Sequence, residues 1–158
     1  MRRRAPRIDL DQFASYRLSV LSGAWGAASE RFYRQRFGLA LREWRVLAVL
    51  SRLERSDDAM PASEIVRLTA VEKAGISRAL ASLERRGLVV RAWSESDGRR
   101  AQVTLTAAGR SLLRRLAPAA LARQASLLSA LTPGERRTFF ALLEKFERRV
   151  AELGGERR

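Results

Sequence analysis

Two arginines that follow a predicted tight turn are the residues in this sequence best suited to chemistry. Asp97 and Gly98 form a hairpin-turn dipeptide, and Arg99 and Arg100 come directly after it. An arginine held at a hairpin tip can enter the narrow, electronegative minor groove of DNA. Asp97 can pair with a guanidinium group and fix its direction. A surface turn with solvated charges is the simpler alternative for the same residues.

A predicted helix over residues 72–86 carries the second group of candidate residues. Its inward face is indicated by apolar residues at helical spacing, namely Ile76, Ala79, Leu80 and Leu83. The outward face carries Lys73, Ser77, Arg78 and Ser82, which can approach base edges and phosphates. An ordinary solvated helix face fits these residues equally well. Gly75 lowers helix stability, and we interpret it as a point of close backbone approach to DNA.

The elements around these residues predict a winged helix-turn-helix over residues 61–109. A short helix begins at Pro61, whose missing N–H is tolerated in a first turn, and the turn falls at residues 69–70. The helix over 72–86 follows and ends at Gly87, and strands at 88–93 and 102–105 form a basic hairpin, the wing. Such a module places a helix in the major groove and a loop in the adjacent minor groove. The hairpin beside the helix therefore favours the DNA interpretation of both groups.

Long helices flank this module on both sides. We expect helices over residues 9–37, 41–54 and 107–130, with Gly38 ending the first and Thr106 capping the third. Thr132, Pro133 and Glu135 form a capping box that opens a last helix. The fold class is therefore mainly α with a small β-hairpin wing. We divide the chain into residues 1–37 (arm and dimerisation helix), 38–109 (DNA-binding domain) and 110–158 (C-terminal dimerisation helices).

The apolar faces of the first and last helices have little to pack on within one 158-residue protomer. A homodimer built from both chain ends accounts for them, and the alternative is that they fold back on their own domain. Residues 1–8 form a basic arm with four arginines, which can touch a DNA backbone or fray as a solvated tail.

Composition narrows the function classes. The chain has a net charge of +14, and all but two of its 31 basic residues are arginines, although genomic base composition can also produce such an excess. It has no cysteine and no histidine, which excludes thiolate or histidine metal sites and Ser-His or Cys-His catalysis. Acidic residues lie on helix faces beside arginines, for example Glu84 before Arg85, and we interpret them as solvated pairs. We therefore predict no enzyme activity, no cofactor and no metal.

The sequence shows neither a signal-peptide pattern nor a stretch of about 18 apolar residues that a membrane span needs. We therefore expect no membrane association and a cytoplasmic location.

Three motifs resemble those of the MarR family of transcriptional regulators. The wing resembles the family signature in Asp97-x-Arg99 and Leu105-Thr106-x-x-Gly109, and the helix before it in Ser77-Arg78-x-Leu80-x-x-Leu83-Glu84-x-x-Gly87-Leu88-Val89. The run Glu43-Trp44-Arg45-Val46-Leu47 is similar to the second helix of members that respond to aromatic acids. Ala74 departs from the pattern, because many members carry a serine or threonine hydroxyl there.

This resemblance implies an obligate homodimer, a pseudo-palindromic operator in double-stranded DNA and repression relieved by a small ligand. It also implies that Arg99 is the minor-groove arginine and that Ser77 and Arg78 contact DNA. The expected function is a sequence-specific DNA-binding transcriptional regulator. A DNA-binding or architectural protein without an effector is the alternative.

The resemblance further implies a ligand pocket between the dimerisation helices and the DNA module. The candidates to line it are Tyr16, Arg17, Trp25, Trp44 and Arg45. Aromatic walls with an arginine suit an aromatic carboxylate. Aromatic residues at helical spacing are also typical of a plain hydrophobic core, and for Trp44 we favour that role.

Overall fold

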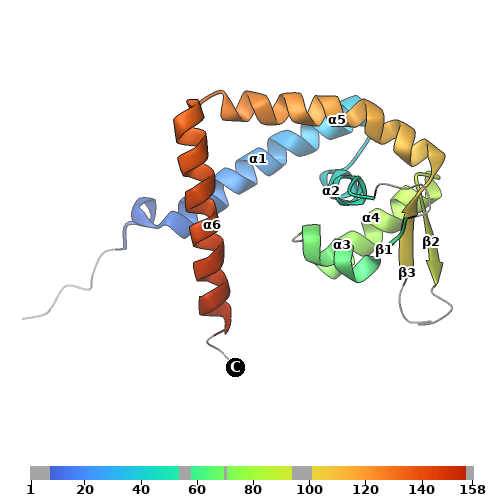
Figure 1. Ribbon diagram of the computed structural model, residues 1–158, viewed down its shortest axis with the longest axis horizontal. Helices are drawn as coiled ribbons and strands as arrows, with labels where there is room; N and C mark the ends of the chain where they lie inside the picture. Colours follow the sequence, from blue (N-terminus) through green and yellow to red (C-terminus); the bar gives the residue numbers. More distant parts are fainter. Residues whose placement is uncertain (1–7, 54–57, 70, 94–100, 156–158) are drawn as a thin grey trace, which may run out of the picture. The chain divides into compact units, whose positions relative to one another are not determined.

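A computed structural model describes residues 8–53, 58–69, 71–93 and 101–155 of the chain (Figure 1). The chain divides into two compact units, Met1–Arg114 and Arg115–Arg158. The elements are η1 (Leu10–Gln12), α1 (Ala14–Phe37), α2 (Leu41–Leu50), β1 (Met60–Pro61), α3 (Ala62–Thr69), α4 (Lys73–Arg85), β2 (Val89–Trp93), β3 (Ala101–Leu105), α5 (Ala107–Leu128) and α6 (Pro133–Gly155). The predicted class, mainly α with a small β-hairpin wing, is confirmed.

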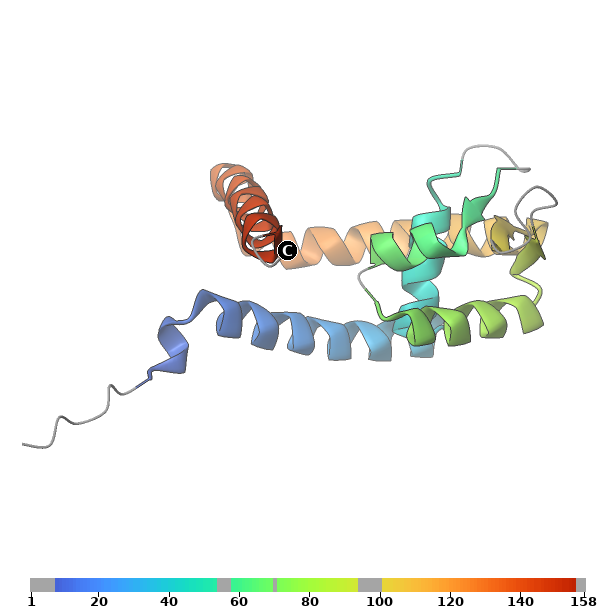
Figure 2. The same cartoon turned by 90° about the horizontal axis from the view of Figure 1, so that it is seen from below.

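The core of the first unit lies between α2, α3 and α4. α2 packs against both other helices, and Figure 2 shows the three together. Completely or almost completely buried side chains come from each helix and from the sheet: Val46, Leu47, Leu50, Ile65, Ile76, Leu80, Leu83, Val89 and Val103. The four residues predicted to face inward from α4 are all buried. These contacts fix the orientation of α4 and so determine which of its residues face outward.

The strands form an antiparallel sheet of three, in the order β1-β3-β2. Val89 pairs with Leu105 and Trp93 with Ala101, which confirms the predicted pairing of the wing strands. Strand β1 was not predicted. Pro61 belongs to this strand and pairs with Gln102, so its placement in the first turn of a helix was wrong. Proline is tolerated here because β1 is an edge strand of the described sheet, where one side makes no ladder hydrogen bonds.

Glycines end two helices as predicted. Gly38 follows α1 and Gly87 follows the last turn of α4. Their φ angles are 63° and 65°, in the left-handed region that commonly ends a helix.

α2 ends at Leu50, although the prediction extended it to residue 54. The Ser51 hydroxyl donates to the carbonyl of Ala48 at 2.6 Å, and tighter turns follow in which Leu53 N–H donates to the carbonyl of Leu50. A serine that bonds the backbone in this way competes with the helix ladder.

Threonine caps open both C-terminal helices. Thr106 Oγ1 accepts the N–H of Gly109 at 3.0 Å at the start of α5. At the start of α6, Thr132 Oγ1 accepts the N–H of Glu135 at 3.3 Å, and Glu135 Oε2 accepts the N–H of Thr132 at 2.8 Å. Both predicted caps are confirmed, and the second is a complete capping box. Within the described ranges, none of the helices combines the length and apolar character that a membrane crossing requires.

Candidate nucleic-acid interface

α4 presents an outward face of polar and small residues. Lys73, Ser77 and Arg78 are exposed and Ser82 is half-buried, so all four predicted DNA-contacting residues of this helix lie on or beside its outward face. The residues on the opposite side of α4 recur at helical spacing and are buried against α2 and α3. The polar residues therefore point away from the core. The surface is small, cationic and rich in hydroxyl groups, and it can donate hydrogen bonds to phosphates and base edges.

The C-terminal end of α4 is fixed by its own backbone. Leu88 N–H donates to the carbonyl of Leu83 and Gly87 N–H to the carbonyl of Glu84, both at 2.9 Å. This pair of bonds is a Schellman motif, and it needs the left-handed conformation that Gly87 adopts. The helix therefore turns sharply into β2, which places the first wing strand directly after it.

An ion pair joins α4 to the wing. Arg91 on β2 donates through Nε to Glu84 Oε2 at 2.8 Å and through Nη2 to the same oxygen, and its backbone N–H donates to Glu84 Oε1 at 3.3 Å. The hydrogen bonds from the Arg91 side chain lower the pKa of Glu84. The interpretation of Glu84 as a solvated partner of Arg85 was therefore wrong. The sequence carries no clear signal for this pair, because its members lie on opposite sides of a turn.

The wing tip lies outside the described residues. Three of the predicted DNA-contacting residues, and the turn that carries them, are therefore not described: Asp97, Arg99 and Arg100. The structure does describe the strand ends on which the turn is mounted, Trp93 and Ala101, as a register pair.

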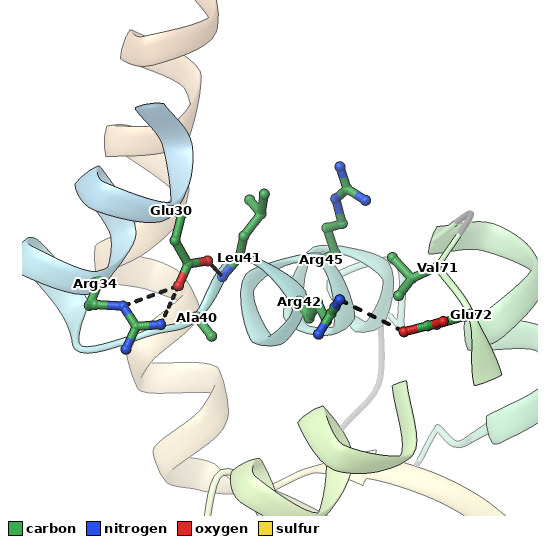
Figure 3. A pocket seen from close by; sticks show the side chains of 8 residues that line it. All are labelled: Glu30, Arg34, Ala40, Leu41, Arg42, Arg45, Val71 and Glu72. Atoms are coloured by element: carbon green, nitrogen blue, oxygen red, sulfur yellow. Dashed lines mark hydrogen bonds and ion pairs between the residues drawn. The ribbon is translucent and has the colours of Figure 1, made fainter. Parts of the chain in front are cut away.

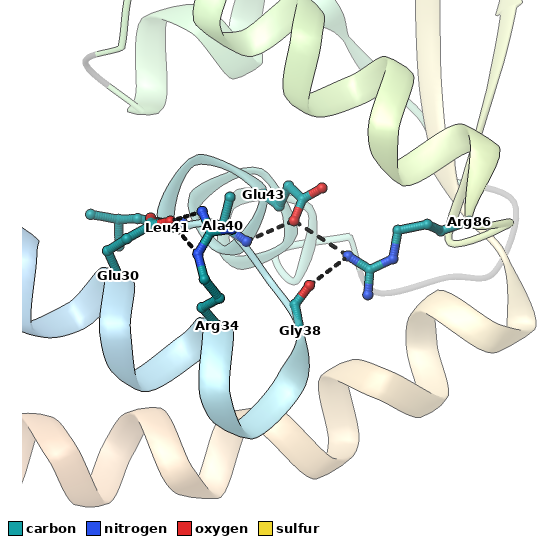
Figure 4. Close-up of polar contacts among 7 residues, drawn as sticks. All are labelled: Glu30, Arg34, Gly38, Ala40, Leu41, Glu43 and Arg86. Atoms are coloured by element: carbon teal, nitrogen blue, oxygen red, sulfur yellow. Dashed lines mark hydrogen bonds and ion pairs between the residues drawn. The ribbon is translucent and has the colours of Figure 1, made fainter.

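A polar network around the buried Glu43 carboxylate braces the junction between α1 and α2 (Figure 4). Glu43 is 6% exposed, and it accepts the N–H of Ala40 at 2.7 Å and Nη1 of Arg86 at 3.3 Å. The same Arg86 nitrogen donates to the carbonyl of Gly38 at 3.1 Å. Arg86 comes from the end of α4, so this network ties that end to the α1–α2 junction.

Glu30 on α1 supports the start of α2 from the other side. It accepts the N–H of Leu41 at 2.6 Å and the side chain of Arg34, and these bonds lower the pKa of Glu30, with the Leu41 bond as the largest cause. The N-terminus of α2 therefore has two carboxylates as caps, a favourable arrangement at the positive end of a helix dipole.

A surface pocket of about 740 Å³ lies beside this capped helix start (Figure 3). Its lining is Glu30, Arg34, Ala40, Leu41, Arg42, Arg45, Val71 and Glu72. Three guanidinium groups and two carboxylates make it net cationic, and its other walls are aliphatic. Such a site can hold a small anion.

The pocket contains one of the five predicted ligand residues, Arg45. Trp44 lies on the neighbouring side of α2 and stacks on Tyr33 at 4.9 Å between ring centroids, consistent with a structural role. Tyr16 and Arg17 are exposed on α1, and Trp25 is half-buried more than two turns further along that helix. The structure therefore does not bring these five residues together within one protomer.

Comparisons with known proteins give the family. The model of the MarR family matches residues 37–100. The HTH-type transcriptional repressor Rv2887 of Mycobacterium tuberculosis is 35% identical over 108 residues, which are 68% of this chain and 75% of that protein. The chain belongs to the MarR family.

Solved structures share the fold. A MarR/EmrR family regulator from Acinetobacter is 26% identical with a TM-score of 0.82, and the match covers 92% of this chain and 99% of that one. BpsR of Bordetella bronchiseptica, whose DNA binding is regulated by 6-hydroxynicotinic acid, is 23% identical with a TM-score of 0.76 over 90% of this chain and 98% of its own. This MarR protein is thus a winged helix-turn-helix transcriptional regulator, a class that binds DNA and is not enzymatic.

Proposed function

We propose that this protein is a homodimeric, sequence-specific repressor that binds a pseudo-palindromic operator and is released by a small anionic ligand. The observation that carries the proposal is the outward face of α4, where Lys73, Ser77 and Arg78 stand exposed on a helix anchored by its buried side. In this role α4 enters the major groove and Arg99 enters the minor groove. The 35% identity to HTH-type repressors supports repression as the sign of regulation.

Exposed apolar side chains on α1 and α6 support the homodimer. On α1 they include Tyr16, Val20 and Leu21, and on α6 they include Phe139, Phe146 and Val150, all at least 38% exposed. None of the described residues of α6 is buried. Large apolar surfaces of this kind mark association sites in soluble proteins. A second copy related by two-fold symmetry covers them and sets two α4 helices on one palindromic site.

The pocket beside α2 supports a small anionic ligand. Arg45 and Arg42 line it together with aliphatic side chains, so a carboxylate on a small ring can pair with a guanidinium group there. An aromatic acid regulates BpsR, which shares the fold. The dispersal of the other ligand candidates favours the alternative, a DNA-binding protein that needs no effector.

Selection of bound sites from random DNA, with the mass of the complex measured by light scattering, tests the proposal. We expect an inverted repeat whose half-site centres are about one helical turn apart, bound by two protomers. A selected pool without sequence preference would contradict sequence-specific binding, and a single protomer on an asymmetric site would contradict the dimer.

The effector has its own test. We expect 6-hydroxynicotinic acid or benzoic acid to raise the melting temperature of the wild-type protein and to release the selected DNA. The Arg45→Ala variant should lose both responses and keep its DNA affinity. Indifference of the wild type to both acids would favour the effector-free alternative.

A further inference from the structure

The N-terminal end of α4 holds a charge cluster of Arg42, Glu72 and Arg78, whose members lie between the outward face of α4 and the pocket beside α2. Glu72 occupies the N-cap position of α4, yet its side chain makes no capping hydrogen bond. Instead its Oε1 lies 3.8 Å from Nη2 of Arg42 on α2 and 3.7 Å from Nη2 of Arg78 on α4. Figure 3 shows Arg42 directed toward Glu72. Guanidinium groups from two different helices thus share one carboxylate oxygen.

Gly75 makes room for this arrangement. It is buried, and a Cβ atom at this position would lie 3.2 Å from Arg42 Nε and 3.1 Å from Val71 Cγ1. Both distances are tighter than ordinary van der Waals contact, so any side chain at residue 75 would press on the arginine. The space next to Gly75 is therefore filled by this chain's own Arg42, in place of the DNA backbone expected from the sequence. Glycine in a helix costs about 1 kcal/mol of stability relative to alanine. The path of the Arg42 side chain explains why a glycine nevertheless occupies this position.

The shared carboxylate is a weak partner for two arginines. Both ion-pair distances exceed hydrogen-bond length, and the side chains of Arg42, Glu72 and Arg78 are 53%, 64% and 68% exposed. Exposed pairs of this kind are worth little in water. Lys73 is also exposed there, and the positive end of the α4 dipole adds to the field. One carboxylate therefore leaves the cluster with an excess of positive charge.

A phosphate group fits this cluster better than the carboxylate does. It offers more oxygens to two guanidinium forks, and helix N-termini with adjacent arginines are common phosphate sites. Arg78 already belongs to the face assigned to DNA, and Arg42 shares its partner, so the two side chains lie on one surface.

We propose that Arg42 and Arg78 form a clamp for one backbone phosphate of DNA, and that Glu72 occupies this clamp when DNA is absent. The inference rests on the proposed DNA-binding function and adds a contact from α2, outside the helix-turn-helix and wing. Once the phosphate is bound, the displaced Glu72 carboxylate remains beside it as a like charge. Glu72 therefore lowers the affinity for every DNA sequence and sets how readily the protein leaves DNA.

Four full-length proteins test the clamp: wild type, Arg42→Ala, Glu72→Gln and the double variant. Each is titrated with the selected duplex and with a duplex of unrelated sequence at several salt concentrations. We expect Arg42→Ala to weaken binding to both duplexes at least about tenfold and to flatten the salt dependence by about two units of slope per dimer. We expect Glu72→Gln to tighten binding to both by about fivefold. This gain should be smaller in the double variant, because the part that acts through Arg42 is lost, while the release of Arg78 and the relief of the like charge remain.

Arg149 and Glu152 supply a matched control. They form an Arg–Glu ion pair on α6 with 59% and 61% exposure, close to the values for Arg42 and Glu72. Arg149→Ala and Glu152→Gln change the net charge identically and should shift the affinity less than twofold at protein concentrations at which both variants are dimeric, since α6 carries part of the proposed dimer surface. Unchanged binding by Arg42→Ala, or equal or weaker binding by Glu72→Gln, would overturn the clamp alone. A wild-type protein that retains no DNA would instead refute the DNA-binding function.

Discussion

Replacement of Gly109 by alanine should destabilise the protein, although alanine is the better helix former. Gly109 lies in the first turn of α5 and is buried. A Cβ atom there would lie 2.1 Å from the carbonyl oxygen of Leu88 and 3.1 Å from its carbonyl carbon. The first distance is far shorter than any van der Waals contact. An alanine at this position would therefore force α5 away from the chain segment that follows α4.

Two hydrogen bonds resist that separation. Thr106 N–H donates to the carbonyl of Leu88 at 3.1 Å, and the Thr106 hydroxyl donates to the carbonyl of Gly87 at 2.7 Å. Loss of both bonds costs about 1 kcal/mol each, and overpacking costs about 1–3 kcal/mol. The helix propensity of alanine returns about 1 kcal/mol. The net loss is about 3 kcal/mol, which lowers the melting temperature of a chain of this size by about 6–12 °C.

Gly134 provides the matched comparison. It also lies in a first turn behind a threonine cap, but a Cβ atom there would meet only Arg137 Nη2, at 3.9 Å. Gly134→Ala should therefore raise the stability by up to about 1 kcal/mol. Both variants are melted in a calorimeter at one protein concentration, because association shifts the transition. A Gly109→Ala protein as stable as wild type would refute the close approach, and an equal loss in Gly134→Ala would assign the effect to helix starts in general.

Three further perturbations test other contacts. Arg99→Ala should weaken operator binding at least about tenfold in a fluorescence titration at unchanged melting temperature, and normal affinity would remove the wing from the mechanism. Glu43→Ala should lower the unfolding free energy in urea by about 2 kcal/mol, because the N–H of Ala40 and the exposed Arg86 side chain lose their shared carboxylate partner; a loss below about 1 kcal/mol would contradict the network. The pKa of Glu30 is lowered from 4.5 in the folded protein. The ionised Glu30 carboxylate therefore contributes fully to folding stability above pH 4.5, and this stabilisation is lost as the pH falls through the pKa of the folded state. The stability difference between wild type and Glu30→Gln should accordingly close on acidification below about pH 4.5, and a constant gap would contradict the assignment.

Sequence patterns correctly predicted the structural features that depend on residues close together in the chain. The inward face of α4, the glycine ends at Gly38 and Gly87, and the caps at Thr106 and Thr132 follow from helical spacing and local backbone rules. These features need no knowledge of distant residues, and the structure confirms them. The wing strands are also paired as alternation and the turn signal predicted.

The features that sequence reasoning missed depend on contacts between distant segments. The edge strand β1 exists because β3, far along the chain, offers it a partner, and two residues carry no periodic signal. Glu43 was not recognised as buried, since a carboxylate inside the core is stable only with Ala40 and Arg86 as partners. The assignment of Gly75 to DNA contact also failed because of a distant residue. Arg42 approaches Gly75 from another helix, which the sequence does not indicate.

The two ends of α4 are held with very different strength. At the C-terminal end, the Schellman motif, the Glu84–Arg91 pair and the bonds of Arg86 tie the helix to β2 and to the α1–α2 junction. At the N-terminal end, Glu72 reaches Arg42 and Arg78 only through exposed ion pairs longer than hydrogen bonds. Opening free energies within a fold follow such differences in burial and bonding. In the proposed clamp, the N-terminal end of α4 can therefore exchange Glu72 for a phosphate while the other end keeps α4 and β2 in fixed relation, which is the division of roles that the proposed reading of two grooves requires.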